Sequence, residues 1–144
     1  MDQGIEVLFY GKQFKKLYEK EIAYLRDRYQ LKRIDVDILY CLYESGERNT
    51  SRDINVLNYY NKGHISQSVL HMQEQKLLER VQDDADRRRV HLKLTPKAQE
   101  IVGQIKAIRK KILTVLFEGV TEEEQQMLIA VSHKIKQNIE KALL

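Results

Sequence analysis

Residues Thr50–Thr95 decide the fold of this 144-residue chain and read TSRDINVLNYYNKGHISQSVLHMQEQKLLERVQDDADRRRVHLKLT. Thr50 is followed three residues later by Asp53, a spacing typical of the capping box that begins a helix. A second helix is predicted from about Gly63 to Gln75, because its apolar residues repeat at i, i+4 and i+7. These positions are Ile65, Val69 and Met72. The polar corner between the two helices consists of Asn58, Tyr59, Tyr60 and Asn61.

Two strand-like runs follow, at residues 77–82 and 90–94. In the second run, apolar residues alternate with His91 and Lys93, which is the period-two pattern of a half-buried strand. The tip between the runs carries three consecutive arginines, residues 87–89. A helix pair followed by a basic hairpin is the layout of a winged helix-turn-helix. In that arrangement one helix enters the DNA major groove, and the hairpin reaches the neighbouring backbone or minor groove.

The outward face of the second helix is polar and almost free of acid until Glu74. Ser, Gln and His side chains can donate and accept hydrogen bonds at base edges without repelling phosphate. At the hairpin tip, Arg87 or Arg88 could enter a narrow minor groove, and Asp86 could brace the loop by an ion pair with Arg88. The candidate DNA-binding residues are Ser51, Lys62, His64, Ser66, Gln67, Ser68, His71, Asp86, Arg87 and Arg88. The alternatives are an ordinary solvated helix face and a hairpin tip that serves only solubility.

The composition argues against several other classes of protein. Hydrophobic residues make up 42% and charged residues 32%, a balance unlike that of disordered or membrane proteins. The formal net charge is only +4, so the local concentration of arginines matters more than the total. A single cysteine, Cys41, rules out an internal disulfide framework and is interpreted as core packing rather than as a redox sensor. No apolar run is long enough to cross a bilayer and the charged start lacks a signal-peptide core, so we expect a cytoplasmic protein.

The sequence predicts no enzyme site. It contains no nucleophile–base arrangement and no Gly-rich phosphate loop. His64 and His71 are seven residues apart, too far along one helix to share a metal as an i, i+4 pair does. We therefore expect no catalytic residues, no metal and no cofactor.

Further helices are predicted on both sides of the central region. Before it, the patterns cover about Ile5–Arg28 and Lys32–Ser45, the second closed by Gly46. After it, Thr95-Pro96 begins a long helix that ends at Gly119, and Thr121 with Glu124 forms the capping box of the last helix. The two apolar stripes consist of Ile101, Ile105, Ile108, Ile112 and Leu116 in the first helix and Leu128, Val131, Ile135 and Ile139 in the last.

We predict a mainly α protein with a small β-hairpin wing, folded as a single domain over residues 1–144. Residues 1–31 and 96–144 would supply the dimerisation helices of a homodimer, because terminal helices this long exceed what so small a core needs. Residues 32–95 would form the winged helix DNA-binding lobe. The apolar cluster at residues 7–10 suits contact with a partner subunit, although it could also fold back on its own core.

Three tyrosines, Tyr24, Tyr40 and Tyr43, could line a cleft for a small aromatic or lipophilic effector. The alternative is ordinary core packing.

Residues 31–138 resemble the MarR family (multiple antibiotic resistance regulators) of bacterial and archaeal transcription regulators. The most specific part is Asp86-Arg87-Arg88 followed by Leu94-Thr95, which is similar to the family's wing signature of D-x-R and a later L-T. Leu77-Leu78-Glu79-Arg80 and Thr121-Glu122-Glu123-Glu124 support it. The resemblance implies an obligate dimer that reads a pseudo-palindrome in double-stranded DNA. It also implies that a small molecule could release the DNA.

Two positions depart from the family pattern. Lys76 stands where glycine is common after the recognition helix, so this corner lacks the residue that most easily adopts a left-handed conformation. Gln67 stands where arginine is frequent, which favours adenine over guanine as its partner. The leading hypothesis is a DNA-binding transcription repressor, and the alternative is a protein-binding winged helix without DNA contact.

Overall fold

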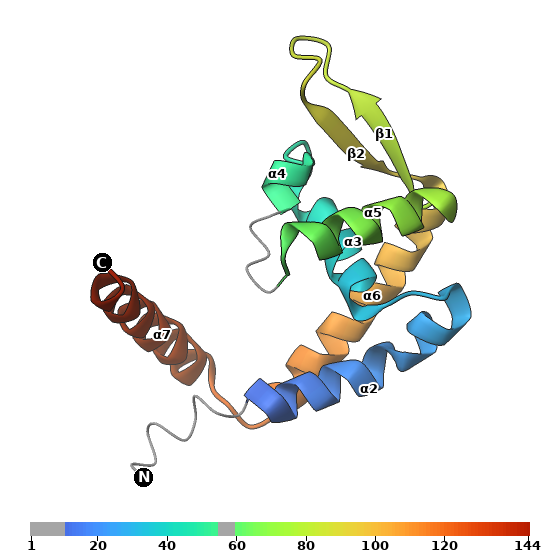
Figure 1. Ribbon diagram of the computed structural model, residues 1–144. Helices are drawn as coiled ribbons and strands as arrows, with labels where there is room; N and C mark the ends of the chain where they lie inside the picture. Colours follow the sequence, from blue (N-terminus) through green and yellow to red (C-terminus); the bar gives the residue numbers. More distant parts are fainter. Residues whose placement is uncertain (1–10, 55–59) are drawn as a thin grey trace. The chain divides into compact units, whose positions relative to one another are not determined.

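The computed structural model describes residues 11–54 and 60–144 (Figure 1). The expected apolar cluster at 7–10 and the part of the polar corner at 58–59 lie outside the described residues. The elements are α2 (Gly11–Tyr29), α3 (Arg33–Ser45), α4 (Ser51–Ile54), α5 (Lys62–Glu74), β1 (Leu78–Gln82), β2 (Val90–Leu94), α6 (Pro96–Leu116) and α7 (Glu122–Ala142). This mainly helical fold with an antiparallel two-stranded wing confirms the predicted fold class. The chain forms two compact units, one up to Arg109 and one from Lys110 onward.

The core of the first unit is built from one apolar face of each long helix. In α5, Ile65, Val69 and Met72 are all buried, as their spacing predicted. The other helices contribute Ile22 and Leu25 from α2, Val36, Ile38 and Leu39 from α3, and Ala98, Ile101, Val102 and Ile105 from α6. Leu92 of β2 and Leu78 of β1 join this core, so the base of the wing is anchored in it.

The helix ends form where the capping residues predict. The Thr50 backbone N–H donates to Asp53 Oδ2 at 3.0 Å, and the Asp53 N–H donates to the Thr50 hydroxyl at 3.3 Å. The Thr50 hydroxyl also donates to Asp53 Oδ2 at 2.7 Å. This bond, followed by the one from the Thr50 backbone N–H, holds the pKa of the Asp53 carboxyl below its usual value. Gly46, with φ of 57°, follows the last residue of α3.

β1 and β2 pair in register from Leu78 opposite Leu94 to Gln82 opposite Val90. Lys76, which stands where the family commonly has glycine, precedes the wing with φ of 60°. Glycine adopts this left-handed conformation at less cost than lysine does. The Thr95 hydroxyl donates to the Lys76 carbonyl at 2.8 Å and accepts the Ala98 N–H at 3.2 Å. Thr95 therefore both closes the wing and begins α6.

In the second unit, α7 begins with the predicted capping box, in which the Glu124 N–H donates to the Thr121 hydroxyl at 3.2 Å. Leu128, Val131 and Ile139 are 49%, 42% and 55% exposed. Their spacing puts these exposed residues on one face of the helix. Among the described residues, no helix combines the length and the hydropathy that crossing a bilayer requires.

Candidate nucleic-acid interface

Helix α5 presents a polar outer face. Asn61 caps it by accepting the His64 backbone N–H on its side-chain oxygen at 2.8 Å, and this bond fixes where the helix begins. Of the candidate residues in this region, Lys62, His64, Ser66 and Gln67 are exposed. Ser51, at the start of α4, is exposed as well.

Ser68 does not belong to that face, so the expectation that it contacts DNA is wrong. It is only 5% exposed, and its hydroxyl donates a hydrogen bond to the buried Asp35 carboxylate of α3. The reason lies in the helical spacing. Ser68 comes three residues after Ile65 and four before Met72, so it falls on the buried side of α5. A buried hydroxyl needs a partner, and Asp35 supplies it.

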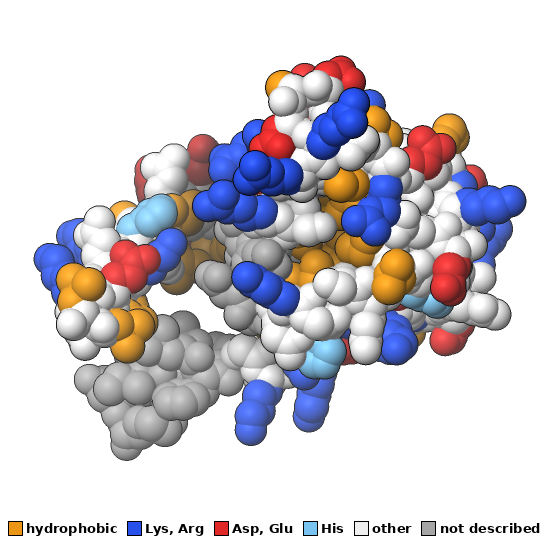
Figure 2. All heavy atoms as spheres, turned by 45° about the horizontal axis from the view of Figure 1, so that its top comes forward, with side chains coloured by type: hydrophobic (Ala, Val, Ile, Leu, Met, Phe, Trp, Pro, Cys, Tyr) orange, Lys and Arg blue, Asp and Glu red, His pale blue; other side chains and the backbone are white. Residues whose placement is uncertain are grey.

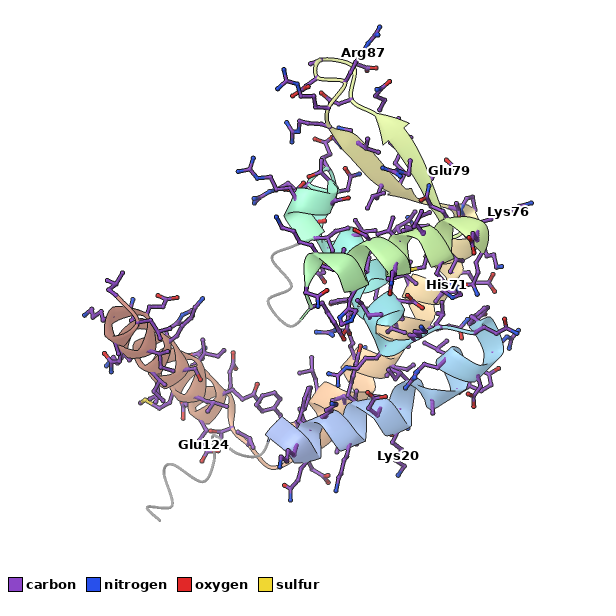
Figure 3. The ribbon with its side chains drawn as sticks, in the orientation of Figure 1. Lys20, His71, Lys76, Glu79, Arg87 and Glu124 are labelled. Carbon is purple, nitrogen blue, oxygen red and sulfur yellow. The ribbon has the colours of Figure 1, made fainter. Side chains whose placement is uncertain are left out.

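His71 also points away from the outer face, contrary to expectation. Its Nε2 lies 3.2 Å from the Gln30 carbonyl oxygen and 3.8 Å from Asp35 Oδ2. Figure 3 shows His71 on the side of α5 that faces α2. With Lys32, Tyr60 and His64 it lines a hollow of about 180 Å³ at the start of α3. His71 therefore contacts the end of α2, while its side chain stays 38% exposed. A contact of His71 with DNA stays a prediction.

A second hollow, of about 600 Å³, separates α4 from the wing. Four arginines line it, namely Arg52, Arg80, Arg88 and Arg89, together with Thr50, Ser51, Asp53, Asp86 and Val90. We call this site the arginine hollow. Figure 2 shows Lys and Arg side chains gathered around the wing and α4. Guanidinium groups with fixed fork geometry are well suited to phosphate oxygens.

Three members of the arginine hollow, Arg52, Arg80 and Arg89, were not among the residues expected from the sequence. Arg80 looked like part of a strand, and Arg52 is separated from the wing by many residues. In the structure, the residues of β1 after Leu78, Arg80 among them, are all exposed. That α4 faces the wing follows only from the folded chain.

The wing tip is held by main-chain hydrogen bonds. The Arg88 N–H donates to Asp86 Oδ1 at 3.0 Å, and the Asp86 N–H donates to Asp83 Oδ2 at 2.9 Å. Asp86 therefore braces the turn through the backbone N–H of Arg88. The sequence predicts instead an ion pair between Asp86 and the Arg88 guanidinium. Arg87 lies at the end of the wing (Figure 3).

His91 joins the tip-side half of the wing to the residue that precedes Thr50 and α4. Its Nδ1 lies 2.5 Å from Asn49 Oδ1, and its Nε2 lies 2.9 Å from Asp83 Oδ1. The hydrogen bond from His91 is the main reason that the pKa of Asp83 is lowered. The Leu92 N–H also donates to the Asn49 carbonyl at 2.9 Å. These contacts set the position of the wing relative to α4.

The three tyrosines expected to line an effector cleft do not come together. Tyr40 and Tyr43 lie on α3 against α6, where the Tyr43 hydroxyl accepts from Lys106 Nζ at 2.8 Å and the Arg109 guanidinium carbon lies 4.0 Å from the Tyr40 ring centroid. Tyr24 is 60% exposed on α2, and its hydroxyl accepts from Arg28 at 2.5 Å. Tyr24 thus faces solvent on α2, apart from the two tyrosines of α3, and an effector cleft lined by all three stays a prediction.

A larger hollow, of about 750 Å³, lies between α2 and the start of α3. Its lining residues are Gly11, Phe14, Lys15, Glu19, Lys32, Arg33, Ile34, Asp37 and Tyr60. Asp37 accepts hydrogen bonds from Tyr18 at 3.1 Å and from Tyr60 at 2.8 Å. The Asp37 carboxylate thus joins α2, α3 and the residue that leads into α5.

A helix-turn-helix with a polar outer face, followed by an arginine-rich hairpin, defines a winged helix DNA-binding protein. Residues 31–98 match a family model described as a winged helix DNA-binding domain. The HTH-type transcriptional regulator YsmB of Bacillus subtilis (strain 168) is 31% identical over 102 residues, which cover 68% of this chain and 69% of that protein. The chain belongs to the MarR family of winged helix-turn-helix transcription regulators. Members of this family regulate transcription and are not enzymes.

Solved structures with the same fold cover nearly the whole chain. The transcriptional regulator PA3341 has a TM-score of 0.82 and 22% identity over 96% of this chain and 98% of that one. A complex of S. aureus MepR with DNA has a TM-score of 0.76 and 18% identity, again over 96% of this chain and 98% of that one.

Proposed function

We propose that this DNA-binding regulator acts as a repressor, and that two copies of the chain bind one pseudo-palindromic operator. The observation that carries the proposal is the arginine hollow, which lies between α4 and the wing in the same compact unit as α5. In the proposed complex, Lys62 and the arginines bind phosphates, and Arg87 reaches towards the minor groove. Ser66 and Gln67 contact base edges from the exposed face of α5. Because the target is chromosomal DNA, we expect the protein to act in the cytoplasm.

The uncovered apolar face of α7 supports a homodimer. Leu128, Val131 and Ile139 would otherwise leave a continuous apolar stripe in water. A second copy of the chain can cover such a stripe with its own, as helical dimers commonly do. The dimer would set the distance between the two recognition helices.

We also propose that a small aromatic or lipophilic compound regulates DNA binding from the hollow between α2 and α3. Phe14 supplies an aromatic wall and Lys15 supplies positive charge, whereas Arg33 is paired with Glu19 and Asp37 of the same hollow. Asp37 and Tyr60 both line this hollow, so a ligand there would compete with the hydrogen bond between them, two residues before α5 begins. This mechanism is consistent with release of DNA on ligand binding.

The salt dependence of binding tests the phosphate contacts. In a titration of a double-stranded DNA fragment by fluorescence anisotropy, affinity should fall steeply with salt, because bound arginines release counterions. Arg52→Ala and Arg89→Ala should each weaken binding to all sequences and reduce the salt slope by roughly 1. Lys20→Ala is the control, because it removes one positive charge from the side of α2 that points away from the wing (Figure 3).

If both arginine variants keep the wild-type slope, the hollow does not bind phosphate. If the wild type shows no salt-dependent binding to any DNA, a protein-binding winged helix is favoured instead.

A further inference from the structure

Leu70 is an exposed apolar residue on the outer face of α5. It is 55% exposed, whereas Ile65, Val69 and Met72 of the same helix are between 0% and 6% exposed. Leu70 lies four residues after Ser66 and three after Gln67, so the three side chains share one side of the helix. Leu70 is thus the apolar member of an otherwise polar reading face.

The surroundings of Leu70 match the major-groove edge of DNA. Its outward neighbours Ser66 and Gln67 are exposed hydrogen-bonding residues, and Lys62 adds positive charge at the start of the helix. A duplex offers hydrogen-bond donors and acceptors on its major-groove edge, and one apolar group, the C5-methyl of thymine. An exposed leucine among polar groups complements that methyl group.

The spacing along the helix also fits. Leu70 follows Gln67 by three residues, which is an axial rise of about 4.5 Å. Successive bases on one strand are separated by about 3.4 Å. A helix lying in the groove therefore brings Gln67 and Leu70 to the same or adjacent base pairs.

We propose that Leu70 is a specificity-determining residue that contacts the C5-methyl group of a thymine, within one base pair of the base contacted by Gln67. The contact removes water from both apolar groups and involves no hydrogen bond. It selects thymine over cytosine and over uracil at that position. The proposal rests on the DNA-binding function, and it adds the base and the chemical group that are read.

The test uses the full chain and a DNA fragment enriched by it from a random pool. Each thymine in one half-site is replaced in turn by uracil, which keeps the base pair and its acceptors but lacks the methyl group. The wild-type protein should lose affinity roughly fourfold at one thymine per half-site, the effect of about one buried methylene-sized group. Other thymines should show little change.

Leucine variants then assign that loss to the side chain. Leu70→Ala should bind the thymine and uracil fragments equally, whereas Leu70→Met should keep the preference for thymine because it retains apolar reach. Both substitutions are at an exposed position, so the thermal unfolding of the variants should match that of the wild type. The proposal is overturned if no thymine is sensitive to the replacement, or if Leu70→Ala retains the wild-type sensitivity. These results still show DNA binding, so they are distinct from failure of the proposed function, which would appear as no enriched fragment.

Discussion

The Tyr60 hydroxyl donates a hydrogen bond to Oδ2 of Asp37 at 2.8 Å, while Tyr18 of α2 donates to the other oxygen of the same carboxylate. Tyr60 is the residue before Asn61, the cap of α5. One carboxylate therefore ties a terminal helix to the entry of the recognition helix. This arrangement gives a direct physical link between the region proposed to bind an effector and the region proposed to read DNA.

Tyr60→Phe should lower the free energy of unfolding by roughly 1–2 kcal/mol, because a part-buried carboxylate loses one of its donors. Urea unfolding followed by circular dichroism measures the change. Tyr24→Phe is the matched control, since its hydroxyl accepts from the exposed Arg28 and the loss of this bond should cost little. Equal stability of the two variants would show that the Tyr60–Asp37 hydrogen bond does not stabilise the fold.

Alkaline pH should weaken the same junction. Burial, and then the nearby Asp37 charge, raise the pKa of Tyr18 from 10.0 to about 12. A folded-state pKa above the unfolded value means that the stabilisation is fully present below pH 10 and is lost as pH rises to about 12. Thermal unfolding between these pH values should show a decline that Tyr18→Phe reduces. A variant that declines as steeply as the wild type would contradict this assignment.

The two neighbouring polar residues Gln67 and Ser68 should behave in opposite ways. Ser68→Ala removes a buried partner of Asp35, so it should lower stability by roughly 1–3 kcal/mol and leave the preferred DNA sequence unchanged. Gln67→Ala should leave stability unchanged and relax the preference at one base pair of each half-site. Selection of bound fragments and chemical unfolding on both variants separate these effects. An altered consensus for Ser68→Ala would mean that its side chain reaches DNA.

Lys76→Gly should stabilise the protein by roughly 1 kcal/mol or less. The left-handed conformation at Lys76 is unfavourable for any residue with a Cβ. Glycine removes that conformational cost but adds flexibility to the unfolded chain, which offsets part of the gain. Lys76→Ala is the control, because alanine retains the Cβ and should give no gain. The melting temperatures of the two variants provide the comparison. If Lys76→Ala raised the melting temperature as much as Lys76→Gly, the gain would come from removing the lysine charge.

The sequence predicted the elements well because their signals are local. Thr50 with Asp53, Thr95 with Pro96 and Thr121 with Glu124 each specify a helix start within a few residues. The stripe of Ile65, Val69 and Met72 likewise predicted the buried side of α5. Such patterns depend on spacing along the chain and need no knowledge of what lies opposite.

The site was harder to predict because its members meet across the fold. Ser68 and His71 look like base-reading residues until α3 places Asp35 beside them. Arg52 and Arg80 become neighbours only when α4 approaches the wing. Tyr24 lies apart from Tyr40 and Tyr43 for the same reason, since helical spacing does not reveal which way α2 turns relative to α3. Long-range packing thus decided which polar residues are available to a ligand.

The most direct test of the central claim is selection of fragments bound by the intact protein from a random pool of double-stranded DNA. The account predicts a two-fold symmetric consensus whose half-sites lie about one helical turn, roughly 10 base pairs, apart. Recovery of a single asymmetric half-site, or no enrichment at low salt, would contradict it.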